Sequence, residues 1–578
     1  MGVSPGIMPF PEWKPDITDL DTEASQNILN VIPRGDGYGP YPGPVAFTQT
    51  VGAACRGYFM ARNADGSVSI FAATSTDLYE LNNSNFTWTK VSLGGGPYSG
   101  LPSTDNWWFL QFNTQVLAGN INVAPQTFTL GSSSAFANLG GSPPQAAYAA
   151  IINRFVVLAG ILNFPSRVQW SGLNALTTWD NVTSQSNFQD LADGGRTRGI
   201  AGGDQFGVIF QETSIRSMIF APGSAVVFDI LRIATNDGAL SPGSIVSAGD
   251  QIFFCSPQGF KVIPPGGYPQ AIGKEKIDRT FFADVDTANL QLFIASTDPT
   301  TTKVYWAYKS ISGQANLFDK ILVYDRALNK WTPLKVSGEY IATLSKPGLT
   351  LENLDAIAPG VITISGATNN GLGAIRLTIS SLTAGTPPSN TNLNTENTVE
   401  VYGVNGTTEA NGNWQFTIIS STQIDLKAST FTNNYTTGGA IGGSLDQLPF
   451  SLDTISSAAL AQLSLIDGTH SLGFFTGANL EAQLETTQKD GMGRRMFITA
   501  TRPLTDAGTV EVSIGWRDTA QSTVAYTAET LVNDIGLCPV DGGGIDARYA
   551  RAKARIPAGS TWTYAMGIQP EFTPTGTA

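Results

Sequence analysis

The chain has 578 residues, of which 42% are hydrophobic and only 14% charged, and its 33 basic and 46 acidic side chains leave a net charge of −13. This acidic balance disfavours stable nucleic-acid binding, because duplex affinity comes largely from neutralising phosphates. No apolar run approaches the roughly 20 residues of a membrane-spanning helix. Three widely spaced cysteines argue against a disulfide framework and a structural zinc site.

Short apolar runs separated by glycine, proline, asparagine and aspartate predict an all-β protein. Residues 1–50 mix a short apolar strand with a Pro/Gly-rich run. They are expected to form an extended arm that closes onto the first unit of the region that follows.

Residues 51–345 repeat a pair of aromatic residues seven to nine positions apart. A repeat of roughly 40–50 residues among strands is typical of a β-propeller, with one four-stranded blade per repeat. The six copies predict about six blades, and the second ring of each pair is expected to fill the gap to the next blade. The pairs are Tyr79…Trp88, Phe128…Phe136, Trp170…Trp179, Phe220…Phe228, Phe260…Tyr268 and Tyr324…Trp331.

The composition changes near residue 346. Residues 355–445 are rich in Thr, Asn, Gly and Ile and contain alternating strands, which predicts a small inserted β-module. Residues 446–578 are expected to form a C-terminal β-rich domain that acts as a platform or closes the propeller. This domain is expected to open with a short helix over Ile455–Leu463.

One stretch of the C-terminal region concentrates positive charge. In RYARAKAR, Arg551, Lys553 and Arg555 alternate with small apolar residues, so a strand would place all three cations on one face. Arg548 adds a fourth cation, and Arg494 and Arg495 lie on a neighbouring candidate strand. The strip is interpreted either as an interface with an acidic subunit or adaptor, or as a solvated strand face.

The sequence contains little evidence of a catalytic site. His470 is the only histidine, no nucleophile-elbow or phosphate-binding loop occurs, and paired aspartates lack a fuller calcium loop. We therefore expect no catalytic site, no metal and no cofactor.

Several segments resemble the tail nozzle or tail-hub family of short-tailed bacteriophages, also called DNA-stabilisation proteins. They are NVIPRGDGYGPYPG, VQWSGLNALTTWD, GGRTRGIAGGDQFGVIFQETSIRSM, LVYDRALNKWT and the C-terminal RPLTDAGTVEVSIGWRDT and DARYARAKARIPAGSTWTYAMGIQPE. The module around VYGVNGTTEANGNWQF resembles a β-module of phage structural proteins and the first catalytic-cysteine half-domain of ubiquitin-activating enzymes. No cysteine lies within 355–445, so no ubiquitin-type chemistry is implied.

The resemblance implies a homohexameric ring below the tail adaptor and portal, located in the virion after synthesis in the host cytoplasm. The ring would contact tail fibres or spikes and internal plug proteins, and genomic DNA would pass through it transiently. An acidic lumen would let the duplex slide without stable binding. Two alternatives stay open: a host-surface propeller that binds or cleaves glycans, and a bacterial scaffold propeller.

Overall fold

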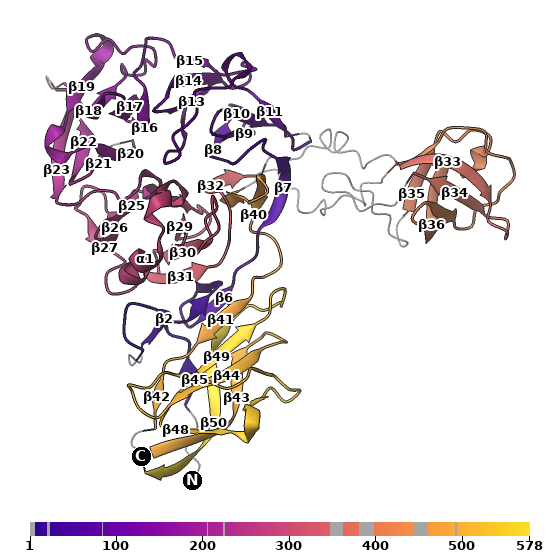
Figure 1. Cartoon of the computed structure of the whole chain (residues 1–578). Helices are drawn as coiled ribbons and strands as arrows, with labels where there is room; N and C mark the ends of the chain where they lie inside the picture. Colours follow the sequence, from indigo (N-terminus) through magenta and orange to yellow (C-terminus); the bar gives the residue numbers. More distant parts are fainter. Residues whose placement is uncertain are drawn as a thin grey trace.

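The computed structural model describes residues 6–19, 23–83, 85–204, 206–223, 226–346, 362–380, 398–442, 460–491 and 494–577. These residues form a propeller of four-stranded sheets, a six-stranded closed barrel and a C-terminal sandwich of two seven-stranded sheets (Figure 1). The all-β propeller fold predicted from the sequence is confirmed. The propeller has seven blades, one more than the six aromatic pairs indicate.

Blades one to six follow one another along the chain, and the strands of each are hydrogen-bonded in sequence order. The first ring of every aromatic pair lies on the third strand of its blade. Blades one and two comprise β8 (Tyr58–Arg62), β9 (Val68–Ala73), β10 (Leu78–Leu81), β11 (Trp88–Lys90), β12 (Trp108–Phe112), β13 (Gln115–Asn120), β14 (Val123–Thr129) and β15 (Ala137–Asn138). Blades three and four comprise β16 (Ala146–Ile152), β17 (Phe155–Ile161), β18 (Phe164–Trp170), β19 (Asn187–Asp190), β20 (Thr197–Ala201), β21 (Phe206–Gln211), β22 (Ser214–Phe220) and β23 (Phe228–Thr235). Blades five and six comprise β24 (Val246–Ala248), β25 (Gln251–Ser256), β26 (Gly259–Ile263), β27 (Gln270–Ala271), β28 (Ile294–Thr297), β29 (Lys303–Tyr308), β30 (Lys320–Asp325) and β31 (Lys330–Leu334).

The seventh blade is assembled from three distant parts of the chain. Its strand order is β32 (Tyr340–Ser345), β39 (Ala461–Ile466), β40 (Ser471–Phe474) and β7 (Val45–Thr50). The arm therefore closes the ring, because it supplies the outer strand of the seventh blade, which packs against the first blade. This assembly corrects the expected boundary at residue 446, because β39 and β40 belong to the propeller. The first part of the C-terminal region thus helps to close the propeller, which was one of its two expected roles. Ala461–Leu463 is strand rather than the end of a helix, and residues 455–459 lie outside the described residues.

Seven hydrophobic clusters fill the seven gaps between neighbouring blades. Each cluster combines the facing strands of two blades, as with Phe71 and Phe128, whose ring centroids lie 5.1 Å apart between blades one and two. A twisted blade cannot bury both faces alone, so the ring of blades is what completes the core.

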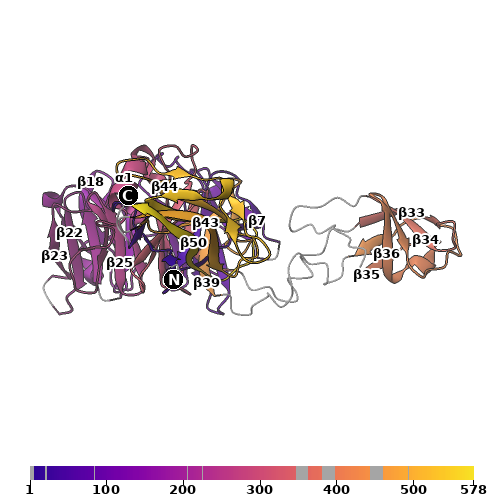
Figure 2. The same ribbon diagram turned by 90° about the horizontal axis from the view of Figure 1, so that it is seen from below.

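The barrel is inserted between the first two strands of the seventh blade. Its circular order is β33 (Ile362–Asn369), β34 (Ile375–Ile379), β37 (Gln423–Leu426), β36 (Gly412–Ser420), β35 (Thr398–Tyr402) and β38 (Ala440–Gly442). Fourteen buried residues, with Phe416 and Leu377 among them, fill its interior. It stands apart from the propeller and the sandwich in both views (Figures 1 and 2).

The arm and the C-terminal residues build the sandwich together. One sheet contains β1 (Met8–Pro9), β5 (Val31–Pro33), β6 (Tyr38–Pro40), β43 (Arg494–Thr505), β47 (Cys538–Pro539), β48 (Ile545–Ala547) and β50 (Ala565–Thr577). The other contains β4 (Ile28–Leu29), β41 (Ala482–Glu485), β42 (Lys489–Asp490), β44 (Glu511–Arg517), β45 (Ala525–Tyr526), β46 (Thr530–Leu531) and β49 (Tyr549–Ile556). A parallel pair, β2 (Glu12–Trp13) and β3 (Ala24–Ser25), completes the arm.

Helical segments are short. The one α-helix, among the residues described, is α1 (Asp278–Asp284), and 3-10 turns include η4 (Pro242–Ser244) and η5 (Thr287–Leu292). Helix α1 and η5 connect blade five to blade six. A single hydrophobic cluster runs from these two blades through Phe10, Trp13 and Val31 of the arm into the sandwich.

Candidate functional sites

The cations predicted to form an interface strip lie on β49, an inner strand of one sandwich sheet. Strand β49 is paired with β41 on one side and β44 on the other. Ala550, Ala552 and Ala554 are buried in the core, so the alternation expected from the sequence places Arg551 and Arg555 on the opposite face.

Carboxylates of the same chain cover Arg551. Its guanidinium lies 3.1 Å from Asp19 Oδ2 and 3.6 Å from Glu485 Oε2. Arg517 Nη2 lies 3.0 Å from the same Asp19 oxygen. The Tyr526 hydroxyl donates to Glu485, and burial together with this carboxylate raises the pKa of the phenol. The arm is thus tied to the sandwich by a buried polar network.

Arg555 is enclosed in the same way. It pairs with Glu481 at 3.2 Å, with Glu529 at 2.7 Å and with Glu511. Hydrogen bonding to Glu529 is the largest contribution that raises the pKa of the guanidinium above its usual range. Both arginines therefore have their charge balanced within the chain.

The other predicted cations do not complete a basic strip either. Arg495 lies 2.8 and 2.9 Å from two sandwich aspartates, and Arg548 lies 4.0 Å from a third. Arg494 is exposed at the start of β43, and Lys553 is half-buried. The predicted interface strip is corrected, because carboxylates of the same chain, distant in sequence, pair with the two arginines at its centre.

The second rings of the aromatic pairs have different environments. Four are buried in the gaps between blades, and Trp88 is half-buried and donates its indole N–H to the carbonyl oxygen of Gln49 at 3.0 Å. Tyr268 is 69% exposed, which corrects its predicted packing role. Phe281 of α1 and Phe293 after η5 pack on Phe260 instead. The four buried rings are Phe136, Trp179, Phe228 and Trp331.

The chain's one histidine lies at the seam between blades seven and one. His470 Nδ1 is 2.6 Å from Oε1 of Glu339, whose other oxygen accepts from the Cys55 N–H at 2.7 Å. Burial is the main cause of the raised pKa of the Glu339 carboxyl. His470 is thus paired with a buried carboxylate that also binds the segment before the first blade.

The central channel of the propeller contains a cavity of about 280 Å³. The innermost strands of six blades line it together with residues 105–107 and 242–245, and seven of its 18 lining residues are aromatic. Phe59 and Phe109 stack with ring centroids 6.0 Å apart and planes 4° apart. Asp105 and Asn106 supply polar groups to the lining.

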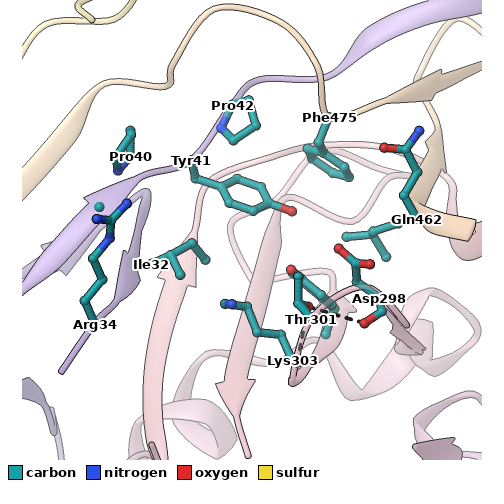
Figure 3. Close-up of a pocket in the computed structure, with 13 residues that line it drawn as sticks. Ile32, Arg34, Pro40, Tyr41, Pro42, Asp298, Thr301, Lys303, Gln462 and Phe475 are labelled. Carbon is teal, nitrogen blue, oxygen red and sulfur yellow. Dashed lines mark hydrogen bonds between the residues drawn. The ribbon is translucent and has the colours of Figure 1, made fainter. Parts of the chain in front are cut away.

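Two further cavities lie where the arm meets the propeller. One, of about 230 Å³, is lined by Tyr41, Lys303 and Phe475, and the Tyr41 ring points across it (Figure 3). Burial raises the pKa of the Tyr41 phenol well above its ordinary value. The other, of about 700 Å³, lies between the arm, α1, blade six and β41. Lys320 and Asp284 of its lining are paired at 2.7 Å.

The outer strands of blade three present an organised exposed cluster that no sequence motif marks. The Arg167 guanidinium lies between two rings, 4.1 Å from the centroid of Phe164 and 3.9 Å from that of Phe188. Asp190 accepts from Arg167 at 2.8 and 2.9 Å. Phe164 and Phe188 remain 49% and 37% exposed. The cluster leaves no contiguous signal in the sequence, because its rings come from two strands separated by a long loop.

Within the described ranges, no cluster of three or more His, Cys, Asp or Glu side chains suits a metal ion. None of the helices in this part of the chain has both the length and the apolar character needed to cross a membrane.

No family model and no curated protein matches the chain. Among solved structures, it is similar to the WD40 domain of Neurospora crassa Pan2, with 9% identity, a TM-score of 0.31, and coverage of 52% of this chain and 87% of that one. It is also similar to a chain of the mitotic checkpoint complex, with 8% identity, a TM-score of 0.29, and coverage of 56% and 90%. Nothing about activity or partners follows from likenesses this distant.

Proposed function

We propose that the chain is a structural subunit of a bacteriophage tail and forms, as a homohexamer, the distal tube or nozzle that retains DNA and then releases it. The observation that carries this proposal is the location of the segments that resemble the nozzle family. Residues 30–43 belong to the arm, 168–180 and 194–218 to blades three and four, 322–332 to blade six, and 502–519 and 546–571 to the sandwich. The family-like pattern therefore spans the propeller, the arm and the sandwich, but not the barrel.

The proposed mechanism is mechanical and electrostatic. An assembly of six copies, each carrying −13, would surround the DNA with negative charge, so phosphates are repelled and the duplex moves without adhesion. The shared core of arm, propeller and sandwich supports a stiff subunit that bears load. The adaptor and portal, tail fibres or spikes, and a plug would be its partners.

Cryo-electron microscopy of the purified virus tests the proposal. The expected result is six copies around the tail axis below the adaptor, with the propeller and sandwich fitting the density as one body. Absence of the chain from virions, or density confined to peripheral fibres, would overturn the nozzle function.

The aromatic central channel favours one alternative, a glycan-binding propeller. Rings offer stacking faces for sugars, and Asp105 and Asn106 offer hydrogen bonds to hydroxyl groups. A glycan array tests this alternative with wild type and Phe109→Ala. Binding that the variant loses would favour it, and absence of binding by wild type would reject it.

A further inference from the structure

The cavity of about 230 Å³ between the arm and the propeller, which we call the arm cavity, is built from three remote segments (Figure 3). The arm contributes Tyr41 and its two flanking prolines. Blade six contributes Asp298 and Lys303, and blade seven contributes Gln462 and Phe475. The volume corresponds to roughly eight water molecules at liquid density, so the cavity admits one small molecule. A concave site with aromatic walls and a few converging polar groups is the usual form of a ligand site.

Polar groups around the arm cavity lack partners in the described part of the chain. The Arg34 guanidinium and the Gln462 amide make no hydrogen bond or ion pair with these residues. Asp298 accepts hydrogen bonds through only one of its two oxygens, at 3.0 and 2.6 Å. The Lys303 ammonium lies 3.6 Å from Asp325, which is too far for a hydrogen bond. The cavity therefore offers donors and an acceptor that the protein itself does not use.

These polar groups lie at two ends of the arm cavity. In Figure 3, Arg34 lies on one side of the Tyr41 ring, whereas Asp298 and Gln462 lie on the other. A ligand that fills the cavity thus meets a cation at one end and a carboxylate with an amide at the other. An α-amino acid does not suit this arrangement, because its ammonium and carboxylate groups are attached to the same carbon. A ring that separates an anionic group from hydroxyl groups does.

The walls of the arm cavity suit the flat face of a sugar ring. The Tyr41 side chain is buried and points across the cavity, and its ring lies against Phe475 with centroids 5.3 Å apart. A carboxylate beside an amide, as in Asp298 and Gln462, can bind two adjacent hydroxyl groups. The guanidinium of Arg34 presents parallel N–H donors that match a carboxylate.

The arm holds its part of the cavity in place before a ligand binds. The Arg34 guanidinium packs on Gly39, where a Cβ atom would lie 2.6 Å from the Arg34 Nε atom. Pro40 and Pro42 restrict the backbone on both sides of Tyr41. A ligand therefore has less conformational freedom to remove when it binds.

We propose that the arm cavity binds one hexuronic acid, either as the free sugar or at the end of a glycan. The carboxylate of the sugar contacts Arg34, and the face of its ring contacts Tyr41. Two adjacent hydroxyl groups bind Asp298 and Gln462. The inference goes beyond the nozzle function and does not depend on it. It also differs from the glycan-binding alternative, because the arm cavity lies outside the central channel and takes an acidic sugar.

Saturation-transfer NMR titrations of the full-length protein test the site. The probes are D-glucuronate and D-glucose, which has the same ring without the carboxylate. We expect glucuronate to bind roughly 10-fold or more tightly than glucose, because only glucuronate forms a charge-assisted pair with Arg34. Arg34→Gln should weaken glucuronate binding roughly 10- to 100-fold and leave glucose binding unchanged. Arg154→Gln, at an exposed arginine of blade three, is the matched control and should change neither.

Gln462→Ala tests the other end of the cavity. The substitution removes an amide without a partner among the described residues, so it breaks no hydrogen bond that they form. We expect it to weaken glucuronate and glucose binding alike, by roughly 2- to 10-fold. Circular dichroism verifies that each variant is folded. A disaccharide that ends in glucuronate distinguishes the two sources: binding indicates the end of a glycan, and exclusion indicates the free acid.

Three results would overturn the inference. They are the absence of saturation transfer from the wild type to glucuronate, equal glucuronate affinities of the wild type and Arg34→Gln, and acetate binding as tight as that of glucuronate. Loss of binding in Phe109→Ala but not in Arg34→Gln would assign the sugar to the central channel and overturn the arm cavity as its site. None of these results bears on the nozzle function, which the electron microscopy tests separately.

Discussion

Arg551 shows why a charged residue cannot be interpreted from its neighbours in sequence alone. Its alternation with alanines correctly indicates a strand with one apolar face. The cation nevertheless contacts Asp19 and Glu485, which are remote in sequence. A buried guanidinium needs such partners, because an unpaired charge is costly to remove from water.

Arg551→Ala is expected to destabilise the sandwich, because it leaves the buried Glu485 without its ion pair. Breaking a buried pair in this way costs about 3–5 kcal/mol. Urea unfolding followed by tryptophan fluorescence measures the change. Lys553→Ala on the same strand is the control and should cost less than about 1 kcal/mol. Equal losses would contradict the buried network.

Trp331 and Tyr268 occupy equivalent positions in the aromatic repeat but differ in burial. Trp331 is fully buried between blades five and six, whereas Tyr268 is exposed. Trp331→Ala should cost about 3–5 kcal/mol through lost burial and a cavity. Tyr268→Ala should change the free energy of unfolding by roughly 0.5 kcal/mol or less. Thermal unfolding of both variants decides whether burial or the repeat position controls stability.

We expect the titration of Asp278 to make the folding stability of the protein depend on pH. Burial is the main cause that raises the pKa of its carboxyl to about 6. The folded state therefore binds more protons than the unfolded state between about pH 4, the ordinary pKa of an aspartate, and about pH 6. This contribution to stability is present at low pH and is lost as pH rises through 6.

Asp278→Asn keeps the acceptor for the Phe260 N–H and removes the charge. The variant should unfold at a higher temperature than wild type at pH 7–8, and the difference should close as pH falls towards 4. A constant difference across this range would exclude titration of Asp278 as its source.

The barrel is an element that the propeller does not need for closure. Ser345 and Ala461 are register partners on β32 and β39, so the chain leaves and re-enters the blade at adjacent positions. The barrel has its own buried core, separate from the clusters of the propeller. Insertions at such hairpin positions are tolerated, because the flanking strand pair is preserved.

Replacing residues 346–460 with an Asn-Gly turn should leave the propeller and sandwich folded, because this dipeptide suits a two-residue hairpin. The expected unfolding temperature lies within a few degrees of wild type, roughly as for a surface change. Calorimetry and circular dichroism measure it. Aggregation of the shortened chain would show that the insertion supports the seventh blade.

The arm joins the propeller and the sandwich into one body. Its strands occupy places in both sandwich sheets, β7 closes the ring, and Trp13 lies in the cluster shared by both domains. The stability of the sandwich therefore depends on residues more than 400 positions away, as the pairing of Ile28 with Leu484 illustrates.

Deleting residues 1–43 should unfold the sandwich while the propeller survives, because the deletion removes β1, β4, β5 and β6 but keeps β7. Limited trypsin digestion, with fragments identified by mass spectrometry, checks this. The expected pattern is rapid loss of residues after about 480 and a persistent propeller fragment. Survival of both parts would show that the sandwich folds without the arm.

Local sequence patterns are enough to predict the six consecutive blades, the strand-rich inserted β-module and the face of β49 that carries cations. These features follow from local periodicity, which sets strand direction and the side that each residue occupies. The seventh blade, the burial of Trp331 rather than Tyr268, and the partners of Arg551 are set by the three-dimensional fold. Each of these depends on segments remote along the chain, and local patterns do not specify which distant strands or carboxylates meet.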